Sequence, residues 1–175
     1  MTTLFTWTDT PLGRMLLVAD AEGLTGAYFA GQKYLPPVDP AWREEPQAPV
    51  LASATQHVAA YFAGEIIDLP LPLAPRGTPF QHAVWRAIAT VPLGQTATYG
   101  ALTQQLGMAN GARAVGAATG RNPLSLFVPC HRIVGADGSL TGYAGGLERK
   151  RALLALESDG PQAVARQLAT LPEVR

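Results

Sequence analysis

The first half of the chain places apolar and polar residues in short alternating runs, which is typical of β-strands. Three such runs are separated by turns, and a longer run with helical spacing follows them and ends at Gly64. We expect strands at 4–8, 14–19 and 24–30 and a helix at 51–63. Residues 31–50 hold five prolines and little periodicity, so they are expected to form an irregular surface loop. The repeated prolines of 69–75 predict a linker.

The second half changes to helical spacing. Helices are expected at 80–90, 98–106, 111–121 and 147–157, and a short apolar strand at 124–128. Thr98 is placed to cap the second of these helices, and Gly107 to end it. The two short helices and their connection have the spacing of a helix-turn-helix, whose second helix enters a groove of DNA. An ordinary helical hairpin in a protein core has the same pattern.

Composition narrows the classes of protein that remain. The chain has 175 residues, of which 47% are hydrophobic and 15% charged, as expected for a folded chain of one large or two small domains. Neither a membrane-spanning run nor a signal peptide is evident. One cysteine cannot form an internal disulfide or a multi-cysteine zinc site. We therefore expect a cytoplasmic protein with no membrane partner, no metal and no other cofactor.

Charge is balanced over the chain but unevenly distributed. Residues 1–75 hold eight acidic and three basic side chains, whereas residues 76–157 hold eight basic and three acidic. The two parts therefore carry net charges of −5 and +5. This split indicates two modules, the second of which could meet a polyanion. A solvated basic face would give the same count.

The single cysteine stands in the run Pro129-Cys130-His131-Arg132. A lone cysteine is most often a small buried apolar residue, because only a thiolate reacts and the free thiol has a pKa of about 8.5. Here His131 and Arg132 follow directly, and two cationic or protonatable groups would favour the thiolate. On a strand, however, His131 would point away from the sulfur unless the chain turns or a water bridges the two.

A histidine that acts as a base also needs an orienting group, usually a carboxylate. Up to residue 157 the second half offers only Asp137, Glu148 and Glu157. Asp137 lies in an expected turn, and Glu148 suits the positive end of the last helix. Glu157 lies at the opposite end, where a negative charge is unfavourable, so we expect Glu157 to serve this purpose.

At this point the motifs match a known family. The run from Val128 to Val134 resembles the active-site signature of the O6-alkylguanine-DNA alkyltransferases, the methylated-DNA–protein-cysteine methyltransferases. Further motifs fall in family order: Phe80 to Trp85, Tyr99-Gly100, Ala112 to Gly116, Asn122-Pro123, Gly142 to Gly146, and Lys150 with Leu153, Leu154 and Glu157. The resemblance covers residues 76–160 closely and residues 1–75 loosely.

The resemblance implies an α+β fold. A small N-terminal antiparallel β-sheet with a helix (ribonuclease H-like) would occupy residues 1–75. A helical, winged-helix-like DNA-binding domain with the active site would occupy residues 76–160, and a C-terminal tail residues 161–175. Some relatives carry a cysteine-rich zinc segment, which one cysteine cannot form.

The resemblance also implies a reaction and the residues that perform it. The family flips a damaged guanine out of the duplex and moves the O6-alkyl group irreversibly to a cysteine, one lesion for each protein molecule. By position Cys130 is the acceptor, and His131 is its base through a water. Glu157 would orient His131, Asn122 would brace the active-site loop, and Tyr99 would assist flipping and stabilise the departing guanine.

Other positions would hold the DNA. Arg113 would fill the gap left by the flipped base, with further DNA contacts from Ala112, Gly116, Arg121 and Arg132. The substrate pocket would be lined by Tyr143, Ala144, Gly145 and Lys150, and Ala144 stands where some relatives have serine. The implied partner is double-stranded DNA bearing O6-alkylguanine, with O4-alkylthymine as a second substrate, and the implied state is a monomer.

Two other functions stay open from the residues alone. A lesion-binding protein or transcription factor would use the helix-turn-helix without any chemistry, although such a protein has no need of a thiol beside His131. A cysteine hydrolase could use Cys130, His131 and Asn122. In the known cysteine proteases, however, the nucleophile and base lie far apart in sequence.

Overall fold

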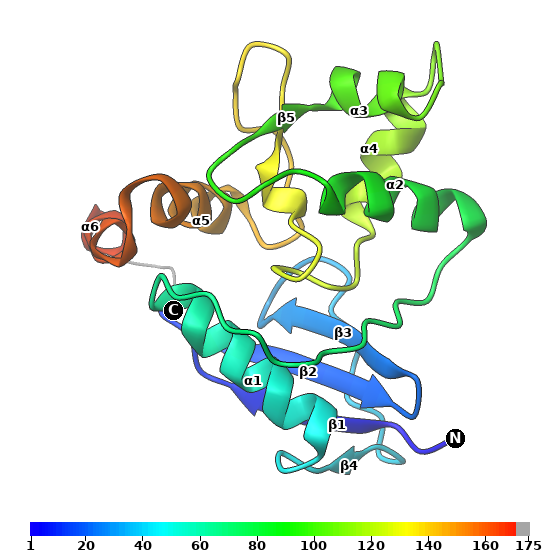
Figure 1. Ribbon diagram of the computed structural model, residues 1–175, viewed down its shortest axis with the longest axis vertical. Helices are drawn as coiled ribbons and strands as arrows, with labels where there is room; N and C mark the ends of the chain where they lie inside the picture. The colour runs from blue at the N-terminus through cyan, green and yellow to red at the C-terminus, as the bar shows by residue number, and fades with distance from the viewer. Residues whose placement is uncertain (171–175) are drawn as a thin grey trace.

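The computed structural model describes residues 1–170, and the side chains of residues 1–168. In chain order its elements are β1 (Leu4–Thr8), β2 (Met15–Asp20), β3 (Gly23–Phe29), β4 (Arg43–Glu44), α1 (Pro49–Phe62), α2 (Pro79–Ala89), β5 (Ala97–Thr98), α3 (Tyr99–Gln105), α4 (Ala112–Gly120), the 3₁₀ turn η1 (Cys130–Arg132), β6 (Ile133–Val134), α5 (Leu147–Asp159) and α6 (Pro161–Thr170). Figure 1 shows the sheet with α1 in one half and α2, α3 and α4 in the other, which confirms the α+β fold.

The N-terminal half is a sheet in the order β3-β2-β1-β4, with α1 packed on one face (Figure 1). The three predicted strands are present and pair in antiparallel fashion. The expected loop at 31–50 contains one short exception, because β4 pairs with β1 in parallel. Alternate residues of the sheet and one face of α1 build the core between them, among them Met15, Leu17, Ala19, Leu51, Ala54 and Val58.

Helix α1 begins two residues earlier than its apolar spacing predicts. Pro49 occupies the first helical position, where its missing N–H costs nothing. The helix ends at Phe62, and the chain turns away through Gly64, whose φ of 73° lies in the left-handed region that favours glycine. This end of α1 points at the second half of the molecule and carries Tyr61 to the boundary between the halves.

The proline-rich linker does more than connect the halves. It runs along the free edge of β3, and the segment before Cys130 continues along the same edge. Four backbone hydrogen bonds make these contacts: Leu24 N to Pro72 O, 2.8 Å; Ala74 N to Leu24 O, 2.8 Å; Ala27 N to Pro123 O, 2.8 Å; and Ser125 N to Ala27 O, 3.0 Å. The edge strand is thus covered, and the segment that leads to the cysteine is tied to the N-terminal sheet.

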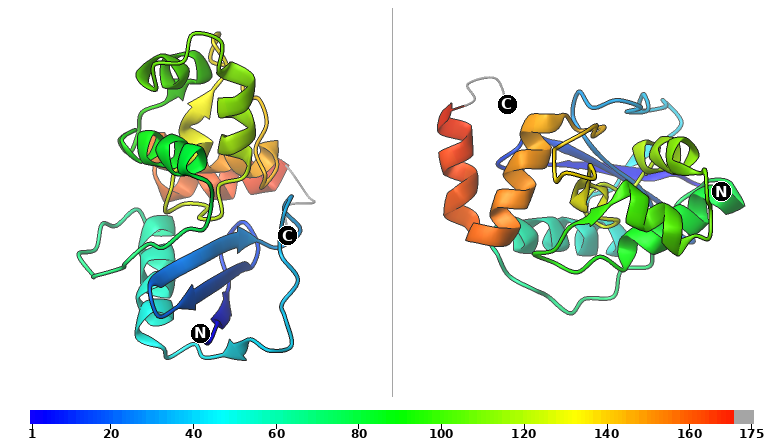
Figure 2. Two further views of the ribbon diagram at one scale, coloured as in Figure 1. Left: turned by 90° about the vertical axis from the view of Figure 1, so that its right-hand side faces the viewer. Right: turned by 90° about the horizontal axis from the view of Figure 1, so that it is seen from above.

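The second half contains the predicted helices, stacked above the sheet in the left view of Figure 2. Thr78 and Gln81 form a reciprocal capping box at the start of α2. Thr98 caps α3 as expected, by accepting a hydrogen bond from Ala101 N. The pair α3 and α4 has the predicted helix-turn-helix order. The sequence did not indicate β5 and β6, which are two residues each and pair in parallel.

The expected strand at 124–128 is wrong. Asn122 folds this segment into a turn, because its side-chain oxygen accepts from Leu124 N at 2.9 Å and its Nδ2 donates to Val128 O at 2.8 Å. Leu126 has a φ of 76°, which no strand allows. Only Leu124 makes a bridge to the sheet. A short apolar run cannot distinguish a strand from a buried turn, and here the asparagine decides.

The C-terminal region is more ordered than the predicted tail suggests. Helix α5 ends at Asp159, and α6 packs beside it, as the right view of Figure 2 shows. Residues 171–175 of that tail lie outside the described residues. Within residues 1–170, no helix is both long and apolar enough to cross a bilayer.

Candidate active site

Cys130 lies in a turn and not at the end of a strand. Cys130 N donates to Val128 O at 2.8 Å, and Cys130 is the first of the three residues of η1, which packs against α5. The cysteine is 6% exposed. Adjacent side chains of a 3₁₀ turn point about one third of a circle apart and not to opposite faces as on a strand, and His131 is directed into the protein, where it is fully buried. The turn that the sequence required is therefore present.

Burial raises the pKa of the Cys130 thiol, although a hydrogen bond from Asn122 and the charge of Lys150 act in the opposite direction. This differs from the expectation that its neighbours favour the thiolate, because the desolvation of a buried sulfur outweighs their effect. The resting side chain is therefore a neutral thiol. Its proton must be removed during reaction.

His131 is placed to receive such a proton. Its Nε2 lies 2.5 Å from Glu157 Oε2, and its side chain is fully buried. Burial lowers the pKa of His131 despite the nearby carboxylate, so the ring is neutral. A carboxylate can only accept, so Nε2 carries the hydrogen and Nδ1 carries the lone pair. Nδ1 has no hydrogen-bond partner within residues 1–170.

Glu157 is held as an anion. Burial alone would raise its pKa, but hydrogen bonds from His131, Arg132 and Tyr61 lower it to about 2. The Arg132 Nε donates to Oε1 at 2.7 Å, and the Tyr61 hydroxyl donates to Oε2 at 2.6 Å. The carboxylate is 2% exposed and nonetheless ionised. The structure thus brings His131 and Glu157 into contact, and Cys130 precedes His131 in η1.

The expectation that Arg132 contacts DNA needs correction. Arg132 is 9% exposed, and its guanidinium bonds Glu157 and, at 2.7 Å, the carbonyl of Val91. These hydrogen bonds hold the guanidinium inside the protein, so it cannot contact a DNA phosphate. The expectation was wrong because the sequence alone does not distinguish a buried arginine from one on the surface.

Asn122 and Lys150 brace the site from two sides. Asn122 holds the turn before Cys130 and makes no contact with His131, so it does not orient that ring as a hydrolase would require. Lys150 is fully buried and donates to the carbonyls of Ile133 at 2.5 Å, Thr141 at 2.9 Å and Gly142 at 3.2 Å. These bonds fix the glycine-rich loop, while burial lowers the Lys150 pKa to about 8.

Tyr143 of the glycine-rich loop and Tyr99 both lie near Cys130. Tyr143 is a half-buried neighbour of His131, with ring centroids 6.4 Å apart, and burial raises its pKa well above the usual value. Ala144 O accepts from Lys33 N, and Gly145 O accepts from Arg149, so the N-terminal half also holds this loop. Tyr99 OH lies 3.4 Å from Thr141 O at the exposed side.

The predicted DNA contacts lie on α4 and just beyond it. Ala112 and Arg113 are exposed at its N-terminal end, and Gly116 is half-buried one turn later. Arg121 is exposed, but its guanidinium stacks on Tyr34 at 3.8 Å from the ring centroid. Arg113 is therefore exposed at the N-terminal end of α4, where it is available to contact DNA.

Sequence reasoning missed Tyr61. It contacts Glu157 across 96 positions of sequence, and the loose family resemblance of residues 61–65 gave Tyr61 no role in the site. The apolar spacing of α1 placed it on the core face, which hid the role of its hydroxyl.

Both halves match known family models. Residues 3–75 match the model described as "6-O-methylguanine DNA methyltransferase, ribonuclease-like domain", and residues 79–159 match the one described as "6-O-methylguanine DNA methyltransferase, DNA binding domain".

Named relatives agree with these models. A "Methylated-DNA--protein-cysteine methyltransferase" of Mycolicibacterium paratuberculosis is 46% identical over 149 residues, which are 85% of this chain and 88% of the relative. One of Haemophilus influenzae is 42% identical over 159 residues, 90% of this chain and 88% of the relative. Among solved structures, "Crystal structure of Mycobacterium tuberculosis OGT in complex with DNA" matches with a TM-score of 0.86 and 41% identity, over 96% of this chain and 99% of that one.

Proposed function

Since the chain belongs to the 6-O-methylguanine DNA methyltransferase family, we propose that Cys130 is the residue that takes the alkyl group from DNA. The protein repairs DNA by transferring an alkyl group to a cysteine of its own. Cys130 is its one cysteine, so no other residue can be the acceptor. The observation that carries the residue assignment is the buried thiol next to a neutral His131, whose Nδ1 is free and whose Nε2 is held by Glu157.

The proposed step moves one proton and one alkyl group. A water relays the thiol proton to His131 Nδ1, and the sulfur attacks the alkyl carbon. The sulfur–carbon bond forms as the carbon–O6 bond breaks, and its electron pair leaves with the guanine. Glu157 stabilises the imidazolium in the meantime. The guanine takes up one proton through water, which returns His131 to its neutral state, and the Tyr99 hydroxyl assists by donating to the departing base.

The thioether product is stable, so each molecule acts once. The neutral resting thiol suits such a reaction, because a permanently ionised cysteine would be open to oxidation and to other alkylating agents. Deprotonation coupled to transfer keeps the sulfur inert until a substrate is in place.

The substrate base must leave the duplex before it can reach this sulfur. The alkyl group of a stacked base is hidden, and extrusion costs a few kcal/mol. We assign the pocket to Tyr143, Ala144 and Gly145, with Lys150 supporting its loop from below the surface, and the wedge that fills the vacated stack to Arg113. The protein would act as a monomer on duplex DNA, with the leading end of α4 in the groove.

A single-turnover assay tests this function. Duplexes carry a labelled methyl group on guanine O6 or on thymine O4, and transfer to the protein is followed with time. We expect stoichiometric transfer from O6-methylguanine, and slower transfer from O4-methylthymine because its ring is smaller. Binding of the methylated duplex with no transferred label would mean that the protein is a lesion-binding module.

Arg113→Ala separates flipping from chemistry. Without the side chain that fills the gap, the flipped state of a duplex is less populated. We expect the single-turnover rate on duplex substrate to fall about tenfold, which corresponds to ~1.4 kcal/mol. The rate on single-stranded substrate should stay unchanged, because no stack is opened there.

Arg151→Ala is the matched control, since Arg151 is an exposed arginine on α5, away from the helix-turn-helix. An equal loss on duplex and single-stranded substrate in Arg113→Ala would disprove the wedge assignment. So would an equal loss in both variants.

A further inference from the structure

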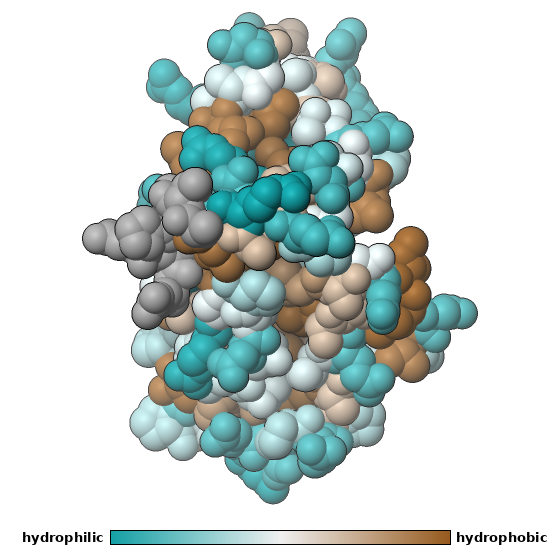
Figure 3. Space-filling view, turned by 90° about the vertical axis from the view of Figure 1, so that its left-hand side faces the viewer, coloured by the Kyte–Doolittle hydropathy of each residue, from teal (hydrophilic) through white to brown (hydrophobic). Residues whose placement is uncertain are grey.

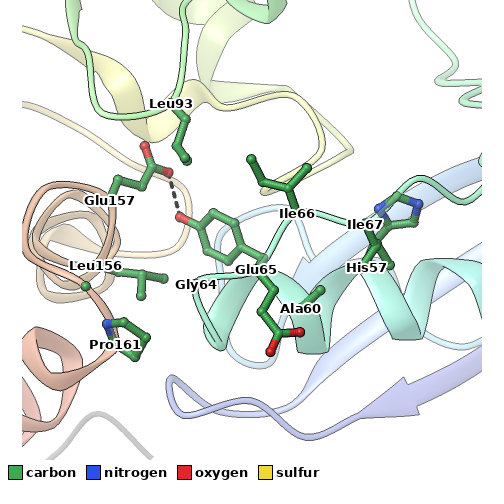
Figure 4. A pocket seen from close by; sticks show the side chains of 12 residues that line it. His57, Ala60, Gly64, Glu65, Ile66, Ile67, Leu93, Leu156, Glu157 and Pro161 are labelled. Atoms are coloured by element: carbon green, nitrogen blue, oxygen red, sulfur yellow. Dashed lines mark hydrogen bonds between the residues drawn. The ribbon is translucent and has the colours of Figure 1, made fainter.

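Glu157 receives a hydrogen bond from outside the motif that forms the reactive centre. The Tyr61 hydroxyl donates to Oε2, the same oxygen that accepts from His131 Nε2. Tyr61 belongs to the last turn of α1, in the N-terminal half of the molecule. This bond is the dashed line that ends on Glu157 in Figure 4. One carboxylate oxygen thus joins the base of the reaction to the other half of the fold.

From this geometry we infer that Tyr61 is a positioning residue for alkyl transfer, which sets the orientation of Glu157 and the proton affinity of His131. The inference rests on the proposed function, because it concerns the same His131 base. Tyr61 touches neither substrate nor sulfur, and it acts through the carboxylate.

The ring of Tyr61 supports the position of its hydroxyl. It meets His131 edge-on with centroids 6.4 Å apart, and Phe62 with centroids 5.2 Å apart. Both contacts restrict the ring, so the hydroxyl is delivered to Oε2 without much loss of side-chain entropy. A donor that is already held in place stabilises the carboxylate more than a mobile donor, because less side-chain entropy is lost when the hydrogen bond forms.

The hydrogen bond between Tyr61 and Glu157 lies at the edge of a cavity. Beside the Tyr61–Glu157 pair lies a cavity of about 380 Å³, lined largely by apolar residues (Figure 4). Its rim includes Ile66 and Leu93, which are 90% and 53% exposed. Figure 3 shows apolar surface gathered along a notch between the two halves. The polar side chains His57 and Glu65 also line this cavity, but Tyr61 is the described residue of its lining that donates a hydrogen bond to Glu157.

The hydroxyl should make the carboxylate a weaker acceptor for His131. A donor to Oε2 draws negative charge from that oxygen, so Glu157 stabilises the imidazolium less than a carboxylate without this donor. The hydroxyl thereby helps to keep His131 neutral and ready to accept a proton at neutral pH. Among the described residues, the titratable and charged groups that act on His131 or Glu157 are Arg132, Lys150, Tyr61 and Tyr143. Cys130 precedes His131 in η1, and His57 and Glu65 line the cavity beside Glu157.

Tyr61→Phe removes only the hydroxyl and keeps the ring. At saturating O6-methylguanine duplex and neutral pH, we expect the single-turnover rate to fall about tenfold, because Glu157 loses the donor that fixes its orientation towards His131. The Kd for DNA should stay unchanged. The acid limb of the rate–pH profile should move up by about half a pH unit or more, because the pKa of His131 rises when Glu157 loses a donor. A purely structural role would leave this limb in place.

Tyr28→Phe is the matched control. Tyr28 is a half-buried tyrosine of β3, on the sheet and away from the reactive centre, and its loss of a hydroxyl should change neither rate nor profile. Thermal unfolding of each variant establishes that the protein is folded under the assay conditions.

These experiments distinguish the role of Tyr61 from the proposed transfer to Cys130. A wild-type rate and profile in Tyr61→Phe, or a slower rate with the acid limb unmoved, would overturn the inference while leaving transfer to Cys130 intact. A wild-type protein that transfers no methyl group would instead overturn the proposed function.

Discussion

Cys130→Ser is expected to bind O6-methylguanine duplex with a Kd close to that of the wild type and to transfer no detectable methyl group. Serine differs from cysteine by one atom, so the packing in η1 and the hydrogen bond from Cys130 N to Val128 O persist. An alcohol is a far weaker acid than a thiol and a weaker nucleophile towards an alkyl carbon, so the same His131 base activates it much less. We expect a loss of at least ~10⁴-fold, which exceeds the usual contribution of a positioned base.

The measurement pairs a labelled-methyl transfer assay with a DNA-binding titration. Cys130→Ala is a second variant that removes any residual nucleophile. Measurable transfer to either variant at a rate within tenfold of the wild type would disprove the assignment of Cys130. Loss of DNA binding together with loss of transfer would show that the cysteine has a structural role in the complex.

Glu157→Gln is expected to have the second largest effect, on both activity and stability. The amide keeps the shape of the side chain but leaves the buried Arg132 guanidinium without its anion. Removing one partner of a buried pair costs about 3–5 kcal/mol. His131 also loses the charge that stabilises its protonated form, so transfer should slow by about 10²-fold or more.

The stability loss should depend on pH. The folded-state pKa of Glu157 is about 2, below its usual value of 4.5, so its contribution to stability is complete above pH 4.5 and is lost as the pH falls from 4.5 towards 2. His131 lowers the stability at a higher pH than Glu157 does. Its folded pKa is lowered from 6.5, so the unfolded chain binds its proton more readily, and stability decreases as the pH falls through 6.5.

Denaturant unfolding of the wild type and of Glu157→Gln at pH 7, 5 and 3 measures this effect. The difference between their free energies of unfolding should be largest at pH 7 and smaller at pH 3. Glu148→Gln, on the exposed side of the same helix, is the control and should show little difference at any pH. An equal difference at pH 7 and pH 3 would show that Glu157 is not held as an anion.

Local patterns predicted much of this fold because they are written in adjacent residues. The alternation of β1 to β3, the glycine that follows the end of α1, the Thr98 cap of α3 and the spacing of α4 all follow from short-range chemistry. The proposed acceptor Cys130 and the contact between His131 and Glu157 could also be predicted from the sequence. Cys130 and His131 are neighbours in sequence, and Glu157 is a carboxylate at an unfavourable helix end.

What the sequence did not reveal depends on contacts between distant segments. Asn122 turns 124–128 away from a strand through bonds that no apolar pattern encodes. Arg132 looks like any basic surface residue until Glu157 and Val91 are brought beside it. Tyr61 joins the site only when α1 is packed on the sheet and α5 lies across its end.

The central claim is that Cys130 itself becomes alkylated, and peptide-resolved mass spectrometry tests it most directly. The wild-type protein is incubated with one equivalent of O6-methylguanine duplex and then digested. We expect the peptide that contains Cys130 to gain the mass of one methyl group in place of hydrogen, in proportion to the guanine restored in the DNA. A methyl group on any other residue, or a bound duplex with no gain in mass on the protein, would contradict it.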